Sequence, residues 1–123
     1  MIRQALAAVI AAAAITAPAA AEKPYGTYAK GTNAPMSFIC PAYDDCTGYY
    51  EGNRSRVRLK GSPSGLFVGI WIEPFTIRSC DATVEKSPHW GRVVLRFDES
   101  ASSWTGEWGY CDDEPSNEWV GSR

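Results

Sequence analysis

The feature that most constrains the fold of this chain is a repeated pattern: an aromatic residue, a glycine and a second large residue, each separated by one position. The pattern occurs at Tyr50-x-Gly52-x-Arg54, Phe67-x-Gly69-x-Trp71, Trp104-x-Gly106-x-Trp108 and Trp119-x-Gly121-x-Arg123. Residues two apart in a β-strand point to the same face, so each repeat predicts two large side chains flanking one bare backbone position. A neighbouring aromatic ring can lie across that glycine. Such alternation fills the interior of small β-barrels.

Other segments also have strand character. Residues 55–60 and 92–98 alternate apolar with charged side chains, which is typical of a strand with one buried and one solvated face. The remaining candidates are residues 36–39, 66–72, 104–110 and 118–122, and more weakly 75–79 and 82–86. After the first 21 residues, no segment keeps a helical period over the length of an ordinary helix. The sequence therefore predicts an all-β fold, a small antiparallel meander barrel of about seven to eight strands.

The first 21 residues, MIRQALAAVIAAAAITAPAAA, have the layout of a secretory signal peptide. Arg3 gives a positive start, an uncharged apolar run follows, and Ala19-x-Ala21 is a small-residue cleavage signature. The apolar run is too short to span a bilayer, although a retained membrane helix is the alternative interpretation. We expect removal of residues 1–21, export to a bacterial periplasm or to the medium, and no membrane association of the mature domain.

All four cysteines lie after the predicted cleavage point, at Cys40, Cys46, Cys80 and Cys111. An even number of cysteines in a small exported domain is typical of disulfides. Among the three possible pairings we favour Cys40–Cys46, because these two residues flank one proline-containing loop, together with Cys80–Cys111, which would bridge two strand ends. A zinc site is the alternative, but the chain has neither a C-x-x-C motif nor a second histidine.

The domain organisation follows from length and composition. Residues 22–35 show no strand or helix period, so we expect an extended N-terminal arm there. Residues 36–123 are expected to form a single β-barrel domain. A barrel leaves two exposed edges unless its last strand pairs with its first. We therefore expect residues 36–40 to supply the closing strand, between the strand at 118–122 and the strand that contains Tyr50.

Two groups of motifs share the spacing of a known family. The first group is Thr47-Gly48-x-Tyr50, Ser55-x-Val57-x-Leu59 and Gly69-x-Trp71; the second is Ser100-x-Ser102-x-Trp104-Thr105-Gly106-x-Trp108, followed by Trp119. They resemble strands one to three, and strands six and seven, of the avidin and streptavidin family. The resemblance covers residues 47–120, lacks the family's last strand, and implies an avidin-like or calycin-like barrel. The C-terminus is also similar to that of small exported bacterial proteins that end in Trp-x-Gly-x-Arg.

The resemblance also implies a set of ligand-binding residues. Carried over position by position, they are Ser55, Trp71, Glu73, Ser100, Ser102, Trp104 and Trp119. Trp71 stands where the family has a tyrosine that donates to the biotin ureido oxygen, and Glu73 stands where it has a neutral serine. A site that must satisfy a buried ureido group loses affinity when its partners are missing. We therefore do not expect tight biotin binding.

Catalytic chemistry finds little support in the sequence. His89 is the only histidine and has no evident serine or cysteine partner, and paired cysteines would supply no thiolate. Asp98, Glu99 and Glu107 could act as in glycoside hydrolysis, but they fall on outward or turn positions. We expect no enzymatic activity and no cofactor.

An acidic run after Cys111 raises the question of a metal site. If Cys80–Cys111 forms, the carboxylates of Asp81 and residues 112–114 would converge, and such oxygen donors can hold Ca²⁺. The run lacks the spaced ligands of a calcium-binding loop, and charged loops beside a disulfide are usually only solvated. We therefore assign no metal-ligating residue.

The leading interpretation is an exported, non-enzymatic binding domain. Its ligand would be a small molecule, a glycan or an extracellular protein, including an enzyme to be inhibited, because Trp and Tyr dominate binding hot spots. The alternatives are a structural, envelope-associated domain whose aromatic residues are all buried, and a small hydrolase. A formal net charge of −2 and the absence of a basic run argue against a nucleic-acid partner.

Overall fold

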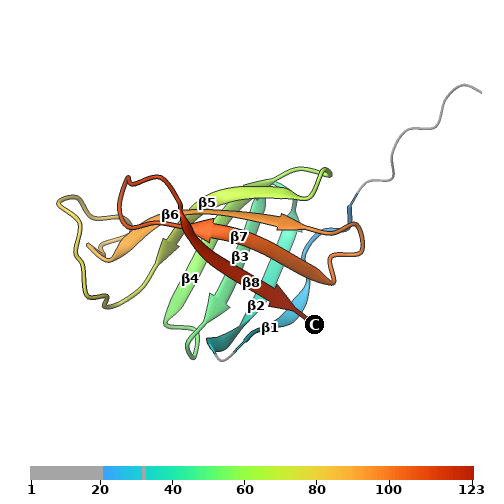
Figure 1. Cartoon of the computed structure of the whole chain (residues 1–123), viewed down its shortest axis with the longest axis horizontal. Coiled ribbons are helices and arrows are strands. Elements are labelled where there is room, and N and C mark those ends of the chain that lie inside the picture. Colours follow the sequence, from blue (N-terminus) through green and yellow to red (C-terminus); the bar gives the residue numbers. More distant parts are fainter. Residues whose placement is uncertain (1–20, 32) are drawn as a thin grey trace, which may run out of the picture.

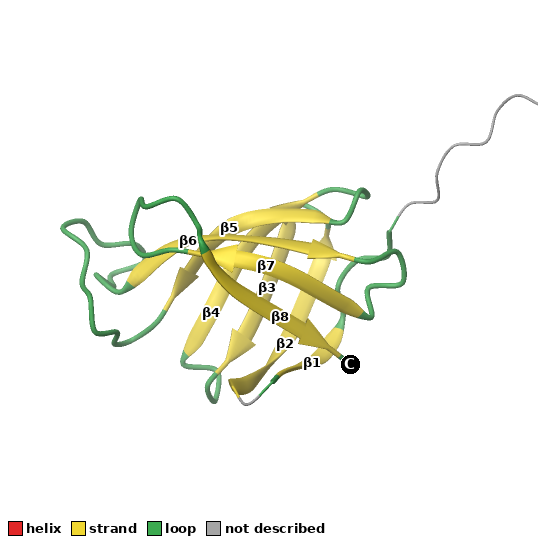
Figure 2. Cartoon of the chain, in the orientation of Figure 1, coloured by secondary structure: helices red, strands yellow, loops and turns green. Residues whose placement is uncertain are grey.

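The computed structural model describes residues 21–31 and 33–123 and shows a closed barrel of eight antiparallel strands in chain order (Figure 1). The strands are β1 (Gly26–Lys30), β2 (Asn33–Ala42), β3 (Asp45–Tyr50), β4 (Ser55–Gly61), β5 (Leu66–Ile72), β6 (Trp90–Phe97), β7 (Ser103–Trp108) and β8 (Asn117–Ser122). Strands, turns and loops account for all described residues (Figure 2), so none of them forms a helix able to cross a membrane. The predicted all-β meander barrel is confirmed. The predicted signal peptide, except Ala21, lies outside the described residues.

Three of the four glycine repeats fill the barrel interior as predicted. Phe67 and Trp71 on β5 are buried, and Trp104 on β7 is only 1% exposed. Gly121 on β8 leaves the space that the Trp104 indole occupies, because a Cβ there would lie 2.4 Å from Trp104 Cε2. The repeat that begins at Tyr50 differs: β3 ends at Tyr50, and Gly52 lies in the following turn with a φ of 68°. A positive φ suits glycine in a tight turn.

The barrel closes differently from the sequence-based expectation. Residues 36–40 lie in β2 and pair with β3, as expected, but their other neighbour is β1, which lies between β2 and β8. Residues 22–35 are therefore not an arm outside the barrel, since they contain β1 and the start of β2. The inward residues of β1 are Tyr28 and Lys30, and a buried lysine hides the apolar–polar alternation that marks a strand. Among the described residues, one ladder pair, Ala29–Ser122, joins β1 to β8.

The connection between β5 and β6, residues 73–89, is a long loop and not a pair of strands. The weak strand candidates at 75–79 and 82–86 both lie in it, and its only described pairing is an isolated bridge between Val84 and Ser87. Two of its apolar side chains, Phe75 and Ile77, are 73% and 91% exposed. A segment with an alternating pattern forms a strand only when a partner strand is available. Here β5 and β6 pair directly with each other and leave no partner for the loop between them.

Both predicted disulfides are confirmed. Cys40–Cys46 joins β2 to β3 over a sequence separation of 6 residues, and Cys80–Cys111 joins residues 31 apart. The second disulfide fastens the 73–89 loop to the connection between β7 and β8. Two covalent links in a small domain are typical of oxidising compartments.

One end of the barrel is plugged by the chain itself. Ala21 and Pro24 are buried there, where the Ala21 N–H donates to the Pro63 carbonyl at 2.7 Å. From the other terminus, the Arg123 guanidinium lies 3.4 Å from the centroid of the Tyr25 ring and donates to the Tyr28 hydroxyl at 3.0 Å. The short turns at 43–44, 62–65 and 98–102 surround this closed end. The opposite end carries the longer 73–89 and 109–116 connections.

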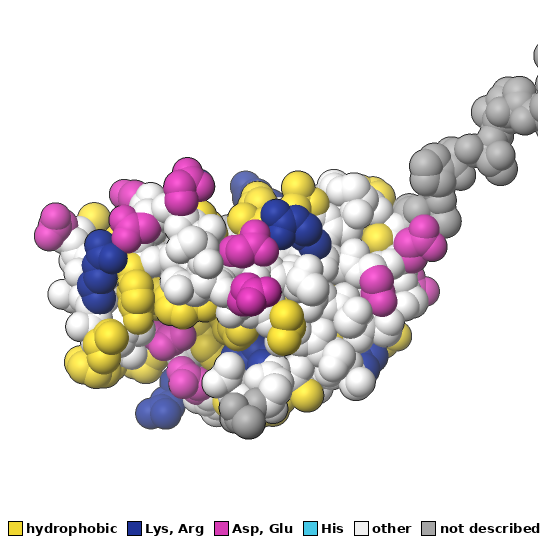
Figure 3. Space-filling view, in the orientation of Figure 1, with side chains coloured by type: hydrophobic (Ala, Val, Ile, Leu, Met, Phe, Trp, Pro, Cys, Tyr) yellow, Lys and Arg dark blue, Asp and Glu magenta, His cyan; other side chains and the backbone are white. Residues whose placement is uncertain are grey.

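The outer surface carries charges of both signs. On the face shown in Figure 3, basic side chains are interspersed with acidic ones. Several are paired, as in Arg96–Glu107 at 3.0 Å and Arg78–Asp113 at 2.8 Å. Exposed pairs of this kind contribute little to stability. Because acidic side chains lie beside the basic ones, the visible face has no continuous basic area.

Candidate ligand-binding site

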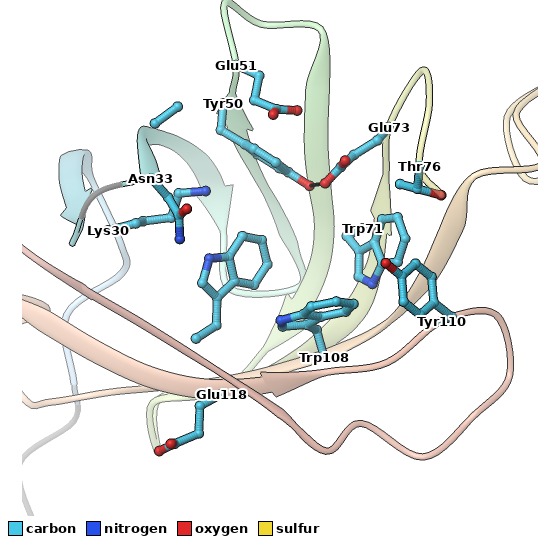
Figure 4. Close-up of a pocket in the computed structure, with 12 residues that line it drawn as sticks. Lys30, Asn33, Tyr50, Glu51, Trp71, Glu73, Thr76, Trp108, Tyr110 and Glu118 are labelled. Carbon is cyan, nitrogen blue, oxygen red and sulfur yellow. Dashed lines mark hydrogen bonds between the residues drawn. The ribbon is translucent and has the colours of Figure 1, made fainter. Parts of the chain in front are cut away.

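A cavity of about 380 Å³ opens at the unplugged end of the barrel (Figure 4). Pockets for small ligands in proteins measure roughly 300–1,000 Å³. Five aromatic residues line it, namely Tyr50, Trp71, Trp108, Tyr110 and Trp119. Charged and polar side chains stand among them: Lys30, Asn33, Glu51, Glu73, Thr76 and Glu118. We call this the mouth cavity.

The aromatic rings on one side of the mouth cavity hold one another in place. Trp71, Trp108 and Tyr110 pack edge to face, with centroids 5.2–5.9 Å apart. The Trp71 indole N–H also donates to the Gly109 carbonyl at 2.9 Å. Edge-to-face packing stabilises such pairs beyond the burial of their area. This wall is therefore preformed, since its rings do not need a ligand to be ordered.

Lys30 is the only basic side chain that lines the mouth cavity among the described residues. It is 4% exposed, and its Nζ lies 4.1 Å from the centroid of the Tyr50 ring and 4.5 Å from that of Trp119. The negative ring faces attract the ammonium group. Burial lowers the pKa of Lys30 to about 8, against the opposing influence of the Glu51 and Glu73 carboxylates. The lysine therefore remains largely protonated at neutral pH.

Glu73 faces the cavity from the start of the long loop. The Tyr50 hydroxyl donates to Glu73 Oε2 at 2.8 Å, as the dashed line in Figure 4 marks. Burial raises the pKa of Glu73, although the hydrogen bond from Tyr50 acts in the opposite direction. Burial and the nearby Glu73 carboxylate raise the pKa of the Tyr50 hydroxyl, so that the tyrosine stays a neutral donor. The mouth therefore combines a fixed carboxylate with a fixed ammonium group.

The structure brings together three of the seven predicted ligand-binding residues. Trp71, Glu73 and Trp119 line the mouth cavity. Ser55 is fully buried beside it and donates to Glu51 Oε1 at 2.5 Å. Trp104 does not line the cavity and lies in the hydrophobic core.

The predicted hydroxyl pair, Ser100 and Ser102, lies at the plugged end of the barrel. Ser102 donates to Asp98 through its backbone N–H and its hydroxyl, at 2.7 and 2.8 Å, and these bonds lower the pKa of Asp98. The resemblance implies that Trp104 lies on a sixth strand, which would run opposite to the first. In the structure Thr47 lies on β3 and Trp104 on β7, because a single strand, β6, separates β5 from β7 where the resemblance implies two. β3 and β7 therefore run in the same direction. Ser100 and Ser102, which come just before β7, consequently lie at the plugged end and away from the mouth cavity.

Several cavity residues were not expected from the sequence. Trp108 and Tyr110 lie on the predicted inward face of the 104–110 segment, which was the signal available for them. Lys30 gave no such signal, because its segment had no recognisable period. Glu51 follows β3 directly, and its position depends on the tight turn at 51–54.

The acidic run after Cys111 does not assemble a metal site among the described residues. Asp113 pairs with Arg78 at 2.8 Å, and Glu114 pairs with Arg92 at 3.6 Å. Across residues 21–31 and 33–123, no group of three or more His, Cys, Asp or Glu side chains is placed to hold a metal ion. His89 lies outside the mouth cavity, with its Nδ1 3.1 Å from the Thr76 hydroxyl.

The mouth cavity must be interpreted from its own chemistry. Its walls are aromatic, its polar groups carry both signs of charge, and it opens beside the long 73–89 loop. Neither family models, nor curated proteins, nor solved structures give a match to this chain.

Proposed function

We propose that this chain is an exported, non-enzymatic binding domain whose mouth cavity takes a small polar ligand. The observation that carries the proposal is the difference between the two barrel ends. Pro24, Tyr25 and Arg123, which remain after removal of residues 1–21, fill one end, whereas the other keeps a preformed, aromatic-lined cavity. A domain with a purely structural role has no reason to keep aromatic rings around an open cavity, because filling it would add buried contact.

Export is supported by two independent features. The disulfides Cys40–Cys46 and Cys80–Cys111 suit an oxidising compartment, and the first 21 residues have the layout of a signal peptide. We assign no catalytic step, since all four cysteines are paired and His89 does not line the cavity. The aromatic residues and the charged groups then serve to bind and orient a ligand.

The proposal is tested with the full chain expressed under its own leader and purified from the bacterial periplasm. A library of small polar compounds is screened by tryptophan fluorescence and by thermal shift. Trp108→Ala should abolish the response to every genuine ligand, because it removes a cavity wall. Phe75→Ala is the matched control, since this exposed aromatic residue lies outside the cavity.

Two outcomes would overturn the proposal. One is a screen without any ligand whose binding depends on Trp108. The other is retention of the chain in the cytoplasm with its leader intact. Cooperative thermal unfolding of Trp108→Ala must first show that the variant is folded, and Tyr110→Ala provides a second cavity variant.

A further inference from the structure

The Lys30 ammonium group lacks an acceptor in the described structure. Its residue is 4% exposed, yet no described residue accepts a hydrogen bond from Nζ or forms an ion pair with it. The Nζ atom reaches the open cavity, where the faces of the Tyr50 and Trp119 rings offset part of the cost of withdrawing the charge from bulk water. An ammonium group has three N–H donors, so an oxygen supplied by a ligand in the mouth cavity would satisfy it.

The acidic side chains of the mouth are also without cationic partners. Glu51 and Glu73 line the cavity, and no described Lys or Arg forms an ion pair with them. The carboxylate of Glu118, at the rim, points away from the cavity (Figure 4). On the outer surface, by contrast, Glu85, Glu107 and Asp113 are all paired. The mouth therefore offers carboxylate acceptors beside the ammonium donors of Lys30.

The signs of these charges restrict the ligand. An anion would be attracted by the Lys30 ammonium group but repelled by the Glu51 and Glu73 carboxylates, whereas a cation would be attracted by those carboxylates but repelled by Lys30. A hydroxyl group resolves both conflicts, because it donates to a carboxylate and accepts from an ammonium group at the same time. A neutral ligand with several hydroxyl groups fits these walls better than an ion.

The aromatic surface supplies the remaining contact. Figure 4 shows the Trp108 ring lying across the cavity below the Tyr50–Glu73 hydrogen bond, with Lys30 and Asn33 on one side and Trp71 on the other. The face of an aromatic ring is negative and attracts the weakly positive C–H groups of a saturated ring. We propose that the ligand of the mouth cavity is a neutral sugar ring, free or at the end of a glycan, that stacks on Trp108 and hydrogen-bonds to Lys30 and Glu73.

This inference rests on the proposed binding function and narrows it to one ligand class. It is tested by saturation-transfer NMR and titration calorimetry on the periplasmic protein. The sugar probes are methyl glycosides of glucose, galactose, mannose and N-acetylglucosamine. The charged probes are tetramethylammonium and benzoate. At least one glycoside should bind and receive the strongest saturation on the C–H groups of a single ring face.

Variants separate the assigned contacts from general damage. Lys30→Met keeps the apolar stem but loses the donors, and should weaken glycoside binding by about tenfold or more. Glu73→Gln should also weaken it, since the amide is uncharged. Lys60→Met is the matched control, because Lys60 is exposed on the outer face of β4, and it should leave affinity unchanged.

A second measurement needs no variant. A bound glycoside should slow the acetylation of Lys30 by acetic anhydride, as followed by peptide mass spectrometry, and should leave Lys60 unaffected. If only tetramethylammonium or benzoate binds in a manner that depends on Trp108, the sugar assignment is wrong and the binding function stands. If glycosides bind but neither protect Lys30 nor depend on it, the assigned contacts are wrong. If no compound binds, both proposals fail.

Discussion

The two disulfides should differ in how much they stabilise the barrel. Replacing Cys80 and Cys111 together by alanine opens a covalent loop of 31 residues, whereas replacing Cys40 and Cys46 opens one of 6. Loop-closure entropy in the unfolded chain grows with the logarithm of loop length. The first replacement should therefore cost about 3.5–4 kcal/mol of unfolding free energy and the second about 2 kcal/mol.

The positions of the two disulfides strengthen this contrast. Cys40–Cys46 joins β2 and β3, which are already paired through Ile39–Thr47 and Phe38–Gly48. Cys80–Cys111 instead fastens the 73–89 loop, whose one described internal pairing is an isolated bridge. Its loss should also loosen the cavity residues that flank it in sequence, and so reduce ligand affinity.

Urea unfolding at pH 7 measures both effects, with the native protein and the two double-alanine variants followed by fluorescence and circular dichroism. Loss of a disulfide also lets the unfolded chain expand, so the dependence of the free energy on urea concentration is fitted for each protein and the free energies extrapolated to water are compared. Equal free energies for the two variants, or a lower one for the Cys40–Cys46 replacement, would refute the reasoning. Alanine is used at both sites because Cys46 is buried, where a serine hydroxyl would add a cost of its own.

Three further predictions concern single side chains. The pKa of Lys30 is lowered to about 8 in the folded state, so the wild type should gain stability as the pH rises from about 8 to 10.5. At pH 7, Lys30→Met should be the more stable protein by about 1 kcal/mol, after allowance for solvent access and the lost ring contacts. Urea titrations should show that this advantage is lost by pH 10.5. Gly121→Ala should destabilise the barrel by about 1–3 kcal/mol, because its Cβ would collide with Trp104, whereas Ser122→Ala on the outer face should have little effect on the melting temperature. Tyr28→Phe should cost about 1–3 kcal/mol in urea unfolding, since the hydroxyl is buried, donates to the Ala101 carbonyl and accepts from Arg123. A stability difference between Lys30→Met and the wild type that does not change with pH, a neutral Gly121→Ala or a neutral Tyr28→Phe would contradict the corresponding contact.

The interior of the barrel could be predicted because the period of a strand is fixed. Phe67, Trp71 and Trp104 all lie on the predicted inward face, and Gly121 makes room for Trp104 as the repeat indicated. The disulfide pairing was also predictable, since one pair lies in a short loop and the other follows by elimination once that pair is accepted.

The ends of the barrel could not be predicted in the same way. Local periodicity tells which face a side chain occupies, but the end at which it lies depends on how many strands come before it. The resemblance implies two strands between the segments that contain Trp71 and Trp104, whereas the structure has one, β6. For this reason Ser100 and Ser102 were assigned to the site, although they lie at the plugged end. Phe75 and Ile77 similarly had strand character without a strand to pair with.

The seam between the first and last strands has a consequence for biosynthesis. Among the described residues a single ladder pair joins β1 to β8, whereas six pairs join β7 to β8, and the seam is reinforced by Arg123 against Tyr25 and Tyr28. Because β1 and β8 lie far apart in sequence, a polypeptide that lacks β8 cannot close the ring. The edges of its β1 and β7 then stay open to pairing with other chains, which favours aggregation.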